Sequence, residues 1–146
     1  MTPLELKELL SEIKSEIPEI NRTISLIDDS DLADFAANMG TSDNMALVGI
    51  IPSYQHSGEI GKFKMLPIFQ LQVIEKTDYS ALNNDEFVLL YQRTLVVIEK
   101  VRDFLIDKVE DGCYPTLSNL DITGLVIDPV KKVSQCNGWA LDIITE

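Results

Sequence analysis

The chain has 146 residues, of which 45% are hydrophobic and 25% charged, and 24 acidic against 12 basic residues give it a formal charge of -12. This length and composition predict one globular domain with its own core and argue against extensive disorder. The acid excess serves solubility, and because it repels phosphate it disfavours nucleic-acid binding through a basic face.

No apolar run approaches the roughly 20 residues needed to cross a bilayer. The first ten residues, MTPLELKELL, lack the basic start and apolar centre of a signal peptide, so we expect a protein kept in a cytoplasm. Cys113 and Cys136 have no second pair with which to form a zinc site. We expect two buried reduced thiols, with a single disulfide as the alternative.

The N-terminal region, residues 1–44, is predicted to be helical. Thr2 can cap a helix over residues 3–16, and Glu5 supplies the carboxylate of a capping box. Apolar residues recur every three or four positions, which predicts a face that packs on the protein's own sheet; a partner helix is the alternative. Because Pro18 interrupts this pattern, residues 22–27 form either a further helical turn or an extended segment.

Acidic residues crowd the next turn, at Asp28, Asp29, Asp31 and Asp34. A calcium loop would require a glycine at its sharp turn and a distal glutamate, and neither stands at the required offset. The cluster is therefore predicted to cap a short helix over residues 32–38, which would end at Gly40.

Two strands joined by a hairpin are predicted next. The apolar run 45–54 indicates a strand buried on both faces, with Pro52 marking its end or a sheet edge. The segment HSGEIGKFK is predicted to be a flexible connection, because its glycines are too closely spaced for a phosphate loop. Residues 67–75 alternate apolar residues with glutamine, which predicts a half-exposed antiparallel strand whose uncharged face suits contact with protein or with water.

A long helix is the clearest element. Asn83 and Glu86 predict a second capping box, and Asp111-Gly112 predicts the end of the helix. About 26 residues at roughly 1.5 Å each give close to 40 Å, long enough to lie across a whole sheet. Its apolar positions form one stripe, made of Phe87, Leu90, Tyr91, Thr94, Ile98, Val101, Leu105 and Val109 and widened by Leu89, Val97 and Phe104.

The C-terminal part predicts two more strands. Residues 124–128 form a short strand that Pro129 stops. Asn137-Gly138 predicts a hairpin turn between residues 131–136 and the last strand, because both of its positions accept positive φ. In the last strand, residues 139–144, Trp139 falls on the face expected to lie under the long helix, where core packing is favoured over stacking on a ligand.

These elements predict a single α+β domain. Its residues 45–146 would form a small, mostly antiparallel sheet of about four strands, packed by the long helix, with the N-terminal helix beside it.

The sequence contains no motif that defines a reaction. His56 lies in a Gly-flanked loop, which is a poor place for a catalytic base. A carboxylate metal site could use Asp28, Asp31, Glu75 and Asp78, although acids in twofold excess also cluster by chance. We therefore expect no enzyme activity, no cofactor and no metal.

The order of elements resembles the tail terminator (tail-completion) proteins of long-tailed bacteriophages. A helix precedes a strand, ALVGIIPSY; a second strand, FQLQVIEKTDYS, leads into the helix NNDEFVLLYQRTLVVIEK; and the chain closes on GWALDIITE. The resemblance covers most of the chain, and residues 17–44 depart from it. Neck and tail-tube proteins share such layouts.

The resemblance implies a non-enzymatic virion protein of the tail or neck. Six copies would form a ring that caps the tail tube and joins it to the head connector, without membrane contact. DNA would pass through without specific binding, because an acidic lumen keeps it from sticking. The expected subunit contacts are the hairpin residues Tyr54, His56, Glu59, Lys62 and Phe63. Two other functions stay open, an acidic adaptor domain that docks a partner on its N-terminal helix and a carboxylate-metal hydrolase.

Overall fold

The computed structural model describes residues 1–78, 81–112, 114–133 and 135–145, of which the side chains of 29, 41, 116, 132 and 133 are not described. The strands are Arg22–Leu26 (β1), Ala46–Glu59 (β2), Lys62–Lys76 (β3), Val126–Val133 (β4) and Cys136–Ile144 (β5). The α-helices are Pro3–Glu16 (α1), Leu32–Ala37 (α2) and Asn84–Glu110 (α3). Short 3-10 turns lie at Asp29–Asp31, Thr41–Asp43, Pro115–Leu117 and Ile122–Gly124.

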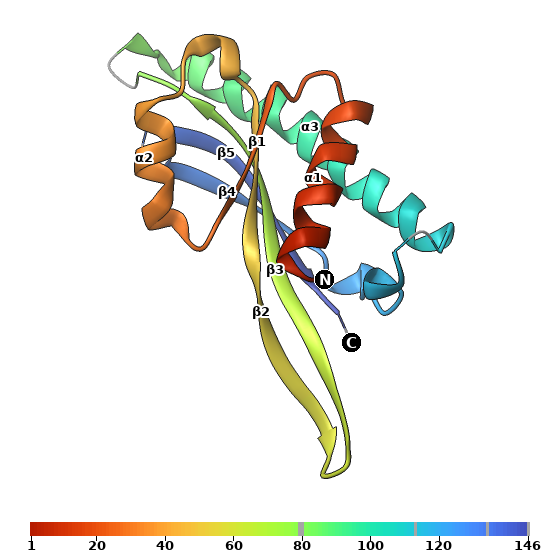
Figure 1. Cartoon of the computed structure of the whole chain (residues 1–146). Helices are drawn as coiled ribbons and strands as arrows, with labels where there is room; N and C mark the ends of the chain where they lie inside the picture. Colours follow the sequence, from red (N-terminus) through yellow and green to blue (C-terminus); the bar gives the residue numbers. More distant parts are fainter. Residues whose placement is uncertain (79–80, 113, 134, 146) are drawn as a thin grey trace.

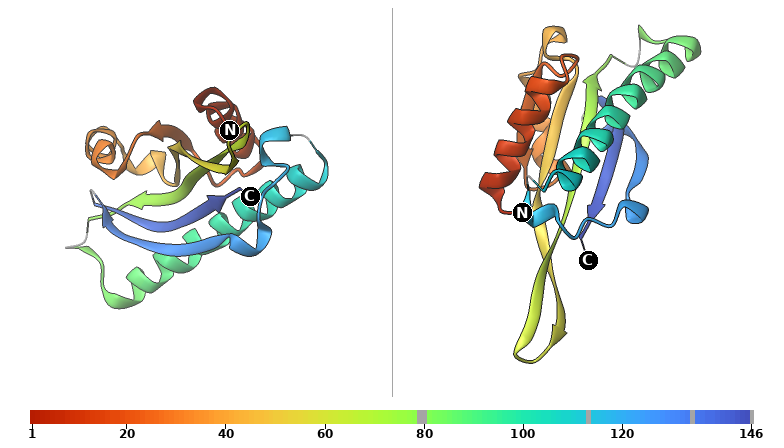
Figure 2. Two further views of the ribbon diagram at one scale, coloured as in Figure 1. Left: turned by 90° about the horizontal axis from the view of Figure 1, so that it is seen from below. Right: turned by 90° about the vertical axis from the view of Figure 1, so that its right-hand side faces the viewer.

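The five strands form one sheet in the order β1-β2-β3-β5-β4. Helices α1 and α3 lie on one face of this sheet and α2 lies on the other (Figures 1 and 2). The predicted α+β class, with a long helix packed on the sheet, is confirmed. The sheet has five strands rather than about four, because the segment after Pro18 supplies an additional one.

Strand β1 resolves the alternative that the sequence left open at residues 22–27. It is extended and pairs in parallel with β2, from Arg22 opposite Ala46 to Leu26 opposite Ile50. Parallel neighbours require a crossover, and α2 lies in the connection between these two strands. The region 1–44 therefore shares the sheet with the rest of the chain and is not purely helical.

Helix α1 has the predicted bounds and capping box. The Thr2 hydroxyl accepts a hydrogen bond from the Glu5 N–H at 3.2 Å, and the Glu5 carboxylate accepts one from the Thr2 N–H at 2.5 Å. These hydrogen bonds lower the pKa of Glu5. The apolar face of the helix is fully buried on the protein's own sheet, so the surface that a partner helix would need is already occupied; it consists of Leu6, Leu9, Leu10 and Ile13.

Helix α3 also has the predicted bounds, and both hydrogen bonds of the Asn83–Glu86 capping box measure 2.9 Å. Its buried stripe consists of Leu90, Thr94, Val97, Ile98, Val101 and Leu105. The prediction for Leu89 is wrong, because its side chain is 60% exposed on the outer face. The C-terminal strand lies under this helix as predicted: the Trp139 indole N–H donates to the Tyr91 carbonyl at 2.9 Å.

Two prolines lie inside strands. For Pro52 the sequence left open a strand end or a sheet edge, and the structure places it at an edge: β1 pairs with β2 only as far as Ile50, the register against β3 shifts between Ile50 and Ser53, and the strand continues to Glu59. The prediction that Pro129 stops its strand is wrong. Pro129 lies within β4 opposite Trp139. Because β4 is an edge strand, one side of its backbone has no neighbouring strand and a missing N–H is tolerated there.

The predicted Asn137-Gly138 turn is also wrong. The chain reverses between Val133 and Cys136, and Asn137 and Gly138 are paired residues of β5. The glycine is required for another reason: a Cβ at this position would stand 1.9 Å from the Val73 carbonyl oxygen of β3. Close approach of two strands, rather than chain reversal, therefore accounts for the glycine at position 138.

The acids after β1 shape a turn. The prediction that they cap α2 is wrong. The N-cap residue of α2, Asp31, makes no side-chain capping hydrogen bond; its carboxylate accepts from the Ile27 N–H at 3.1 Å. The Asp28 carboxylate accepts from the N–H and hydroxyl of Ser30, which lowers the pKa of Asp28. These hydrogen bonds fix the entry into α2 from the N-terminal side.

We predict that Gly138→Ala destabilises the fold strongly, because the new methyl group would overlap the backbone of β3. The free energy of unfolding should fall by about 2–3 kcal/mol, as for an overpacked core. Urea denaturation followed by circular dichroism measures this change. Gly40→Ala is the matched control: the nearest atom to its Cβ is 3.8 Å away, so its effect should stay within about 0.5 kcal/mol. Equal stabilities of the two variants would contradict the assignment.

Candidate interaction surface

The distal half of the β2–β3 hairpin projects from the body of the protein (Figures 1 and 2). We call residues 54–67 the arm; its strands pair continuously from Tyr54 opposite Pro67 to Glu59 opposite Lys62. Only Ile60 and Gly61 form the turn. The prediction of a flexible connection at 56–64 is therefore wrong, because this segment is a regular two-stranded ribbon.

The arm has one aromatic and apolar face and one charged face. Because directly opposed residues share a face, the first carries Tyr54, His56, Phe63 and Met65, and the second carries Gln55, Ser57, Glu59, Lys62 and Lys64. On the apolar face, Phe63 is 65% exposed and Met65 55% exposed. The His56 and Phe63 rings lie 5.7 Å apart between centroids. At the base of the arm, the Tyr54 hydroxyl donates to the Met1 carbonyl at 2.9 Å.

All five residues predicted as subunit contacts lie on the arm. Three of them share its apolar face, and Glu59 and Lys62 oppose each other next to the turn. The sequence interpretation missed Met65 and the exposed turn residue Ile60. The signal for Met65 was the alternation Phe63-Lys64-Met65, which has the period of a strand; no such signal marks Ile60 in the sequence.

The arm also differs from the body in charge. It holds two lysines and one glutamate, Lys62, Lys64 and Glu59, in a chain whose total charge is -12. An isolated two-stranded ribbon is only marginally stable in water, and an exposed apolar patch commonly marks an interaction site. The arm is thus the strongest candidate interaction surface in the described part of the chain.

A groove lies at the other end of the molecule, between the first half of α3 and β5. Its volume is about 230 Å³, and it is lined by Phe87, Val88, Tyr91, Gln92, Leu95 and Trp139. Three of these residues form an aromatic row, with 4.9 Å between the Phe87 and Tyr91 ring centroids and 5.8 Å between those of Tyr91 and Trp139. Val88 is 56% exposed, and Leu89 beside it extends the apolar surface outward. We call this the α3 groove.

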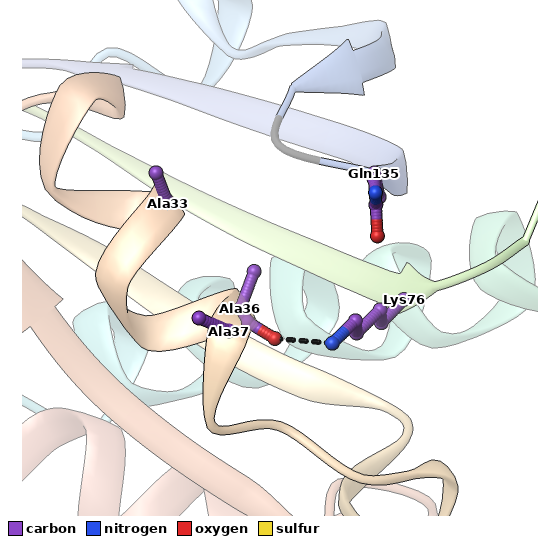
Figure 3. Close-up of a pocket in the computed structure, with 5 residues that line it drawn as sticks. All are labelled: Ala33, Ala36, Ala37, Lys76 and Gln135. Carbon is purple, nitrogen blue, oxygen red and sulfur yellow. Dashed lines mark hydrogen bonds between the residues drawn. The ribbon is translucent and has the colours of Figure 1, made fainter.

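A second hollow of about 230 Å³ lies under α2 and is lined by Ala33, Ala36, Ala37, Lys76 and Gln135 (Figure 3). The Lys76 ammonium group donates to the Ala36 carbonyl at 2.5 Å, as drawn in Figure 3, and to the Met39 carbonyl at 3.2 Å. A cation at the C-terminal end of a helix is favourable. These contacts assign Lys76 to holding α2 on the sheet.

The face of the sheet that carries α2 is less exposed than predicted. Gln72 of β3 was expected on a solvent-facing strand surface, but only 1% of it is exposed. Its amide donates to the Gln70 side chain at 2.6 Å, and the Gln70 amide donates to the Asp142 carboxylate at 2.7 Å. This row of polar groups connects β3 to β5 across the sheet.

The four carboxylates considered for a metal site are not brought together. Asp28 and Asp31 lie in the turn before α2, whereas Glu75 lies on β3 and accepts two hydrogen bonds from Arg93, at 2.8 and 2.6 Å. This ion pair raises the pKa of Arg93. Among the residues that the structure describes, no three His, Cys, Asp or Glu side chains cluster in a way that could hold a metal ion.

Comparison of the chain with protein-family models, with curated proteins and with solved structures finds no match. In the described ranges, no helix combines the length and the apolar character needed to cross a membrane. The fold and the two surfaces, the arm and the α3 groove, are therefore the basis for a functional proposal.

Burial raises the pKa of the Cys136 thiol to about 11, and the charge of Lys76 opposes this shift only in part. Cys136 is free and buried, whereas Cys113 lies outside the described residues. We predict that in a Cys113→Ser variant Cys136 reacts with a thiol reagent at pH 8 about 100-fold more slowly than in the denatured chain, because the thiolate is rare. The absorbance of the coloured group that the reagent releases measures the rate of this reaction. Equal rates in the native and denatured protein would contradict the burial of this thiol.

Proposed function

We propose that this chain is a non-enzymatic structural protein of a phage tail or head-tail neck. Its copies form a ring that caps the tail tube and joins the tube to the head connector. The observation that carries the proposal is the arm, a β-ribbon that extends from the body and presents an apolar face to solvent. The order of elements, which resembles that of tail terminator proteins, supports the virion setting and the copy number of six.

The arm supports assembly for an energetic reason. Fully burying a large apolar side chain contributes about 1.5–3 kcal/mol, and Phe63 and Met65 are both more than half exposed in the single chain. A neighbouring subunit that covers the apolar face of the arm supplies that burial. An arm that projects from one side and docks on another part of the next copy makes a head-to-tail contact, which closes into a ring when the rotation allows it.

The charge of the chain supports the passage of DNA through such a ring. Each copy contributes a formal charge of -12, so a lumen lined by these subunits repels phosphate and does not retain the polymer. The basic residues of the arm lie in subunit contacts, away from the lumen. This arrangement separates the surface that joins subunits from the surface that DNA passes.

The adaptor alternative depended on the N-terminal helix as a docking surface. The apolar face of α1 is buried in the hydrophobic core of the protein, where Leu6, Leu9 and Ile13 are fully covered. Releasing it would expose the sheet beneath, so a partner that needs this face would have to unfold part of the domain. The ring protein is therefore the better-supported proposal.

We predict that the wild-type protein forms rings at micromolar concentration, visible by negative-stain microscopy and by native mass spectrometry. Replacing residues 54–67 by Asn-Gly, which joins Ser53 to Ile68 through a short turn, should give a monomer. Its helix content should stay unchanged, because the arm lies outside the hydrophobic core. Purified tail tubes mixed with the wild-type protein should carry a cap at one end. A wild-type protein that stays monomeric and leaves tubes bare would refute the proposal.

A further inference from the structure

We infer that the arm of one copy docks in the α3 groove of the next copy of the same chain. This inference rests on the proposed ring and names the two surfaces that form it. The occupant of the groove is a β-ribbon whose apolar face carries Phe63 and Met65.

The two surfaces cannot meet within one molecule. Trp139, which lines the groove, pairs with Val73 of β3, and Phe63 lies ten residues earlier on the same strand. At about 3.3 Å per residue this separates the two sites by roughly 33 Å along a continuous strand. Figures 1 and 2 show the arm and the N-terminal half of α3 at opposite ends of the molecule. An arm that occupies a groove of this kind must therefore belong to another copy.

The groove suits a side chain better than a cofactor. Its volume of about 230 Å³ is below the roughly 300–1,000 Å³ of small-molecule sites. Aromatic rings from Phe87, Tyr91 and Trp139 line it, and such rings favour stacked or edge-on contact with another aromatic side chain. Phe63 is the most exposed aromatic residue of the arm and has the chemistry that this lining favours.

Charge favours the same pairing. The arm carries Lys62 and Lys64 against the single acid Glu59, whereas the rest of the chain carries the negative charge. The exposed acids Asp85 and Glu86 lie in the first turn of α3, next to the groove residues Phe87 and Val88. Among the described side chains, Lys131, whose ammonium lies 5.6 Å from the centroid of the Phe87 ring, is an opposing charge at that end. The weakly basic arm is attracted to the acidic body of the next copy. Because Lys62 and Lys64 lie on the face of the arm opposite to Phe63, this attraction guides the approach of the arm and adds no contact inside the groove.

Each copy gives one arm and offers one groove. If the arm of the first copy enters the second and the arm of the second enters a third, the contact is head-to-tail and extends into a ring or a filament, as the proposed ring requires; a reciprocal exchange between two copies would stop at a dimer, and a wild-type chain that forms only dimers would overturn the ring. This difference makes the inference testable by mixing two variants.

The experiment uses one variant for each surface. Phe63→Asp removes the arm anchor, and Val88→Arg fills the groove at a residue that is 56% exposed, so both changes should leave the fold intact. Each variant alone should be monomeric, with association weakened at least tenfold. An equimolar mixture restores one intact contact per pair and should give dimers, at twice the 16.4 kDa chain mass, and nothing larger. Native mass spectrometry separates monomers from dimers by mass.

Matched controls change exposed residues that the proposed contact does not use. Ser57→Ala lies on the charged face of the arm and keeps the charge of the arm, and Leu4→Asp lies on the exposed side of α1; both should keep the rings. Circular dichroism and thermal unfolding check that each variant folds. If Phe63→Asp misfolds, Phe63→Ser replaces it in the same mixing test. If Val88→Arg misfolds, Val88→Ser replaces it.

The remaining outcomes separate the inference from the proposed function. Rings that persist in both variants would overturn the arm-groove contact and leave the ring protein standing. Monomeric variants whose mixture yields no dimer would also overturn it, because the arm would then meet a different surface or a different protein. A wild-type chain that stays monomeric would overturn both.

Discussion

Burial of one half of β3 is the constraint on which the rest of the structure depends. From Phe69 to Glu75 this strand lies between β2 and β5 and under helices on both faces, while its first residues, Lys62 to Met65, stand in solvent. The buried half positions α1, α2 and α3, and the exposed half forms the arm. A single strand thus connects the core to the surface that we assign to subunit contact.

The helices could be predicted from the sequence because their signals are local. Thr2 with Glu5 and Asn83 with Glu86 define helix starts through contacts three residues apart, and the apolar periodicity of α3 needs no knowledge of its neighbours. The strand ends depend on tertiary position. A proline is tolerated at a bulge or on an edge strand. Gly138 is required because the Val73 carbonyl oxygen of β3 leaves no room for a Cβ. None of these circumstances is visible in the few residues around them.

The interaction surface was predictable only in part, for a related reason. The sequence pointed to the hairpin that projects in the structure, because an exposed hairpin was expected to reach the next subunit. It treated the segment as flexible, because two glycines suggest a loop, and so it missed the regular alternation that gives the arm two faces. The α3 groove combines Tyr91 and Trp139, which lie 48 residues apart in the chain, and no local pattern joins them. The role of either surface in assembly stays a proposal.

The pairing of the arm has a consequence for how its length can change. Each residue added to a ribbon advances it by about 3.3 Å and turns the following side chains to the opposite side. Inserting one residue in each strand at the base of the arm would therefore turn its apolar face to the opposite side of the body, whereas inserting two in each would keep the apolar face on its present side and extend the reach. Homologous hairpins of different span should accordingly differ by even steps, and the diameter of any assembly built on them should vary in increments rather than continuously.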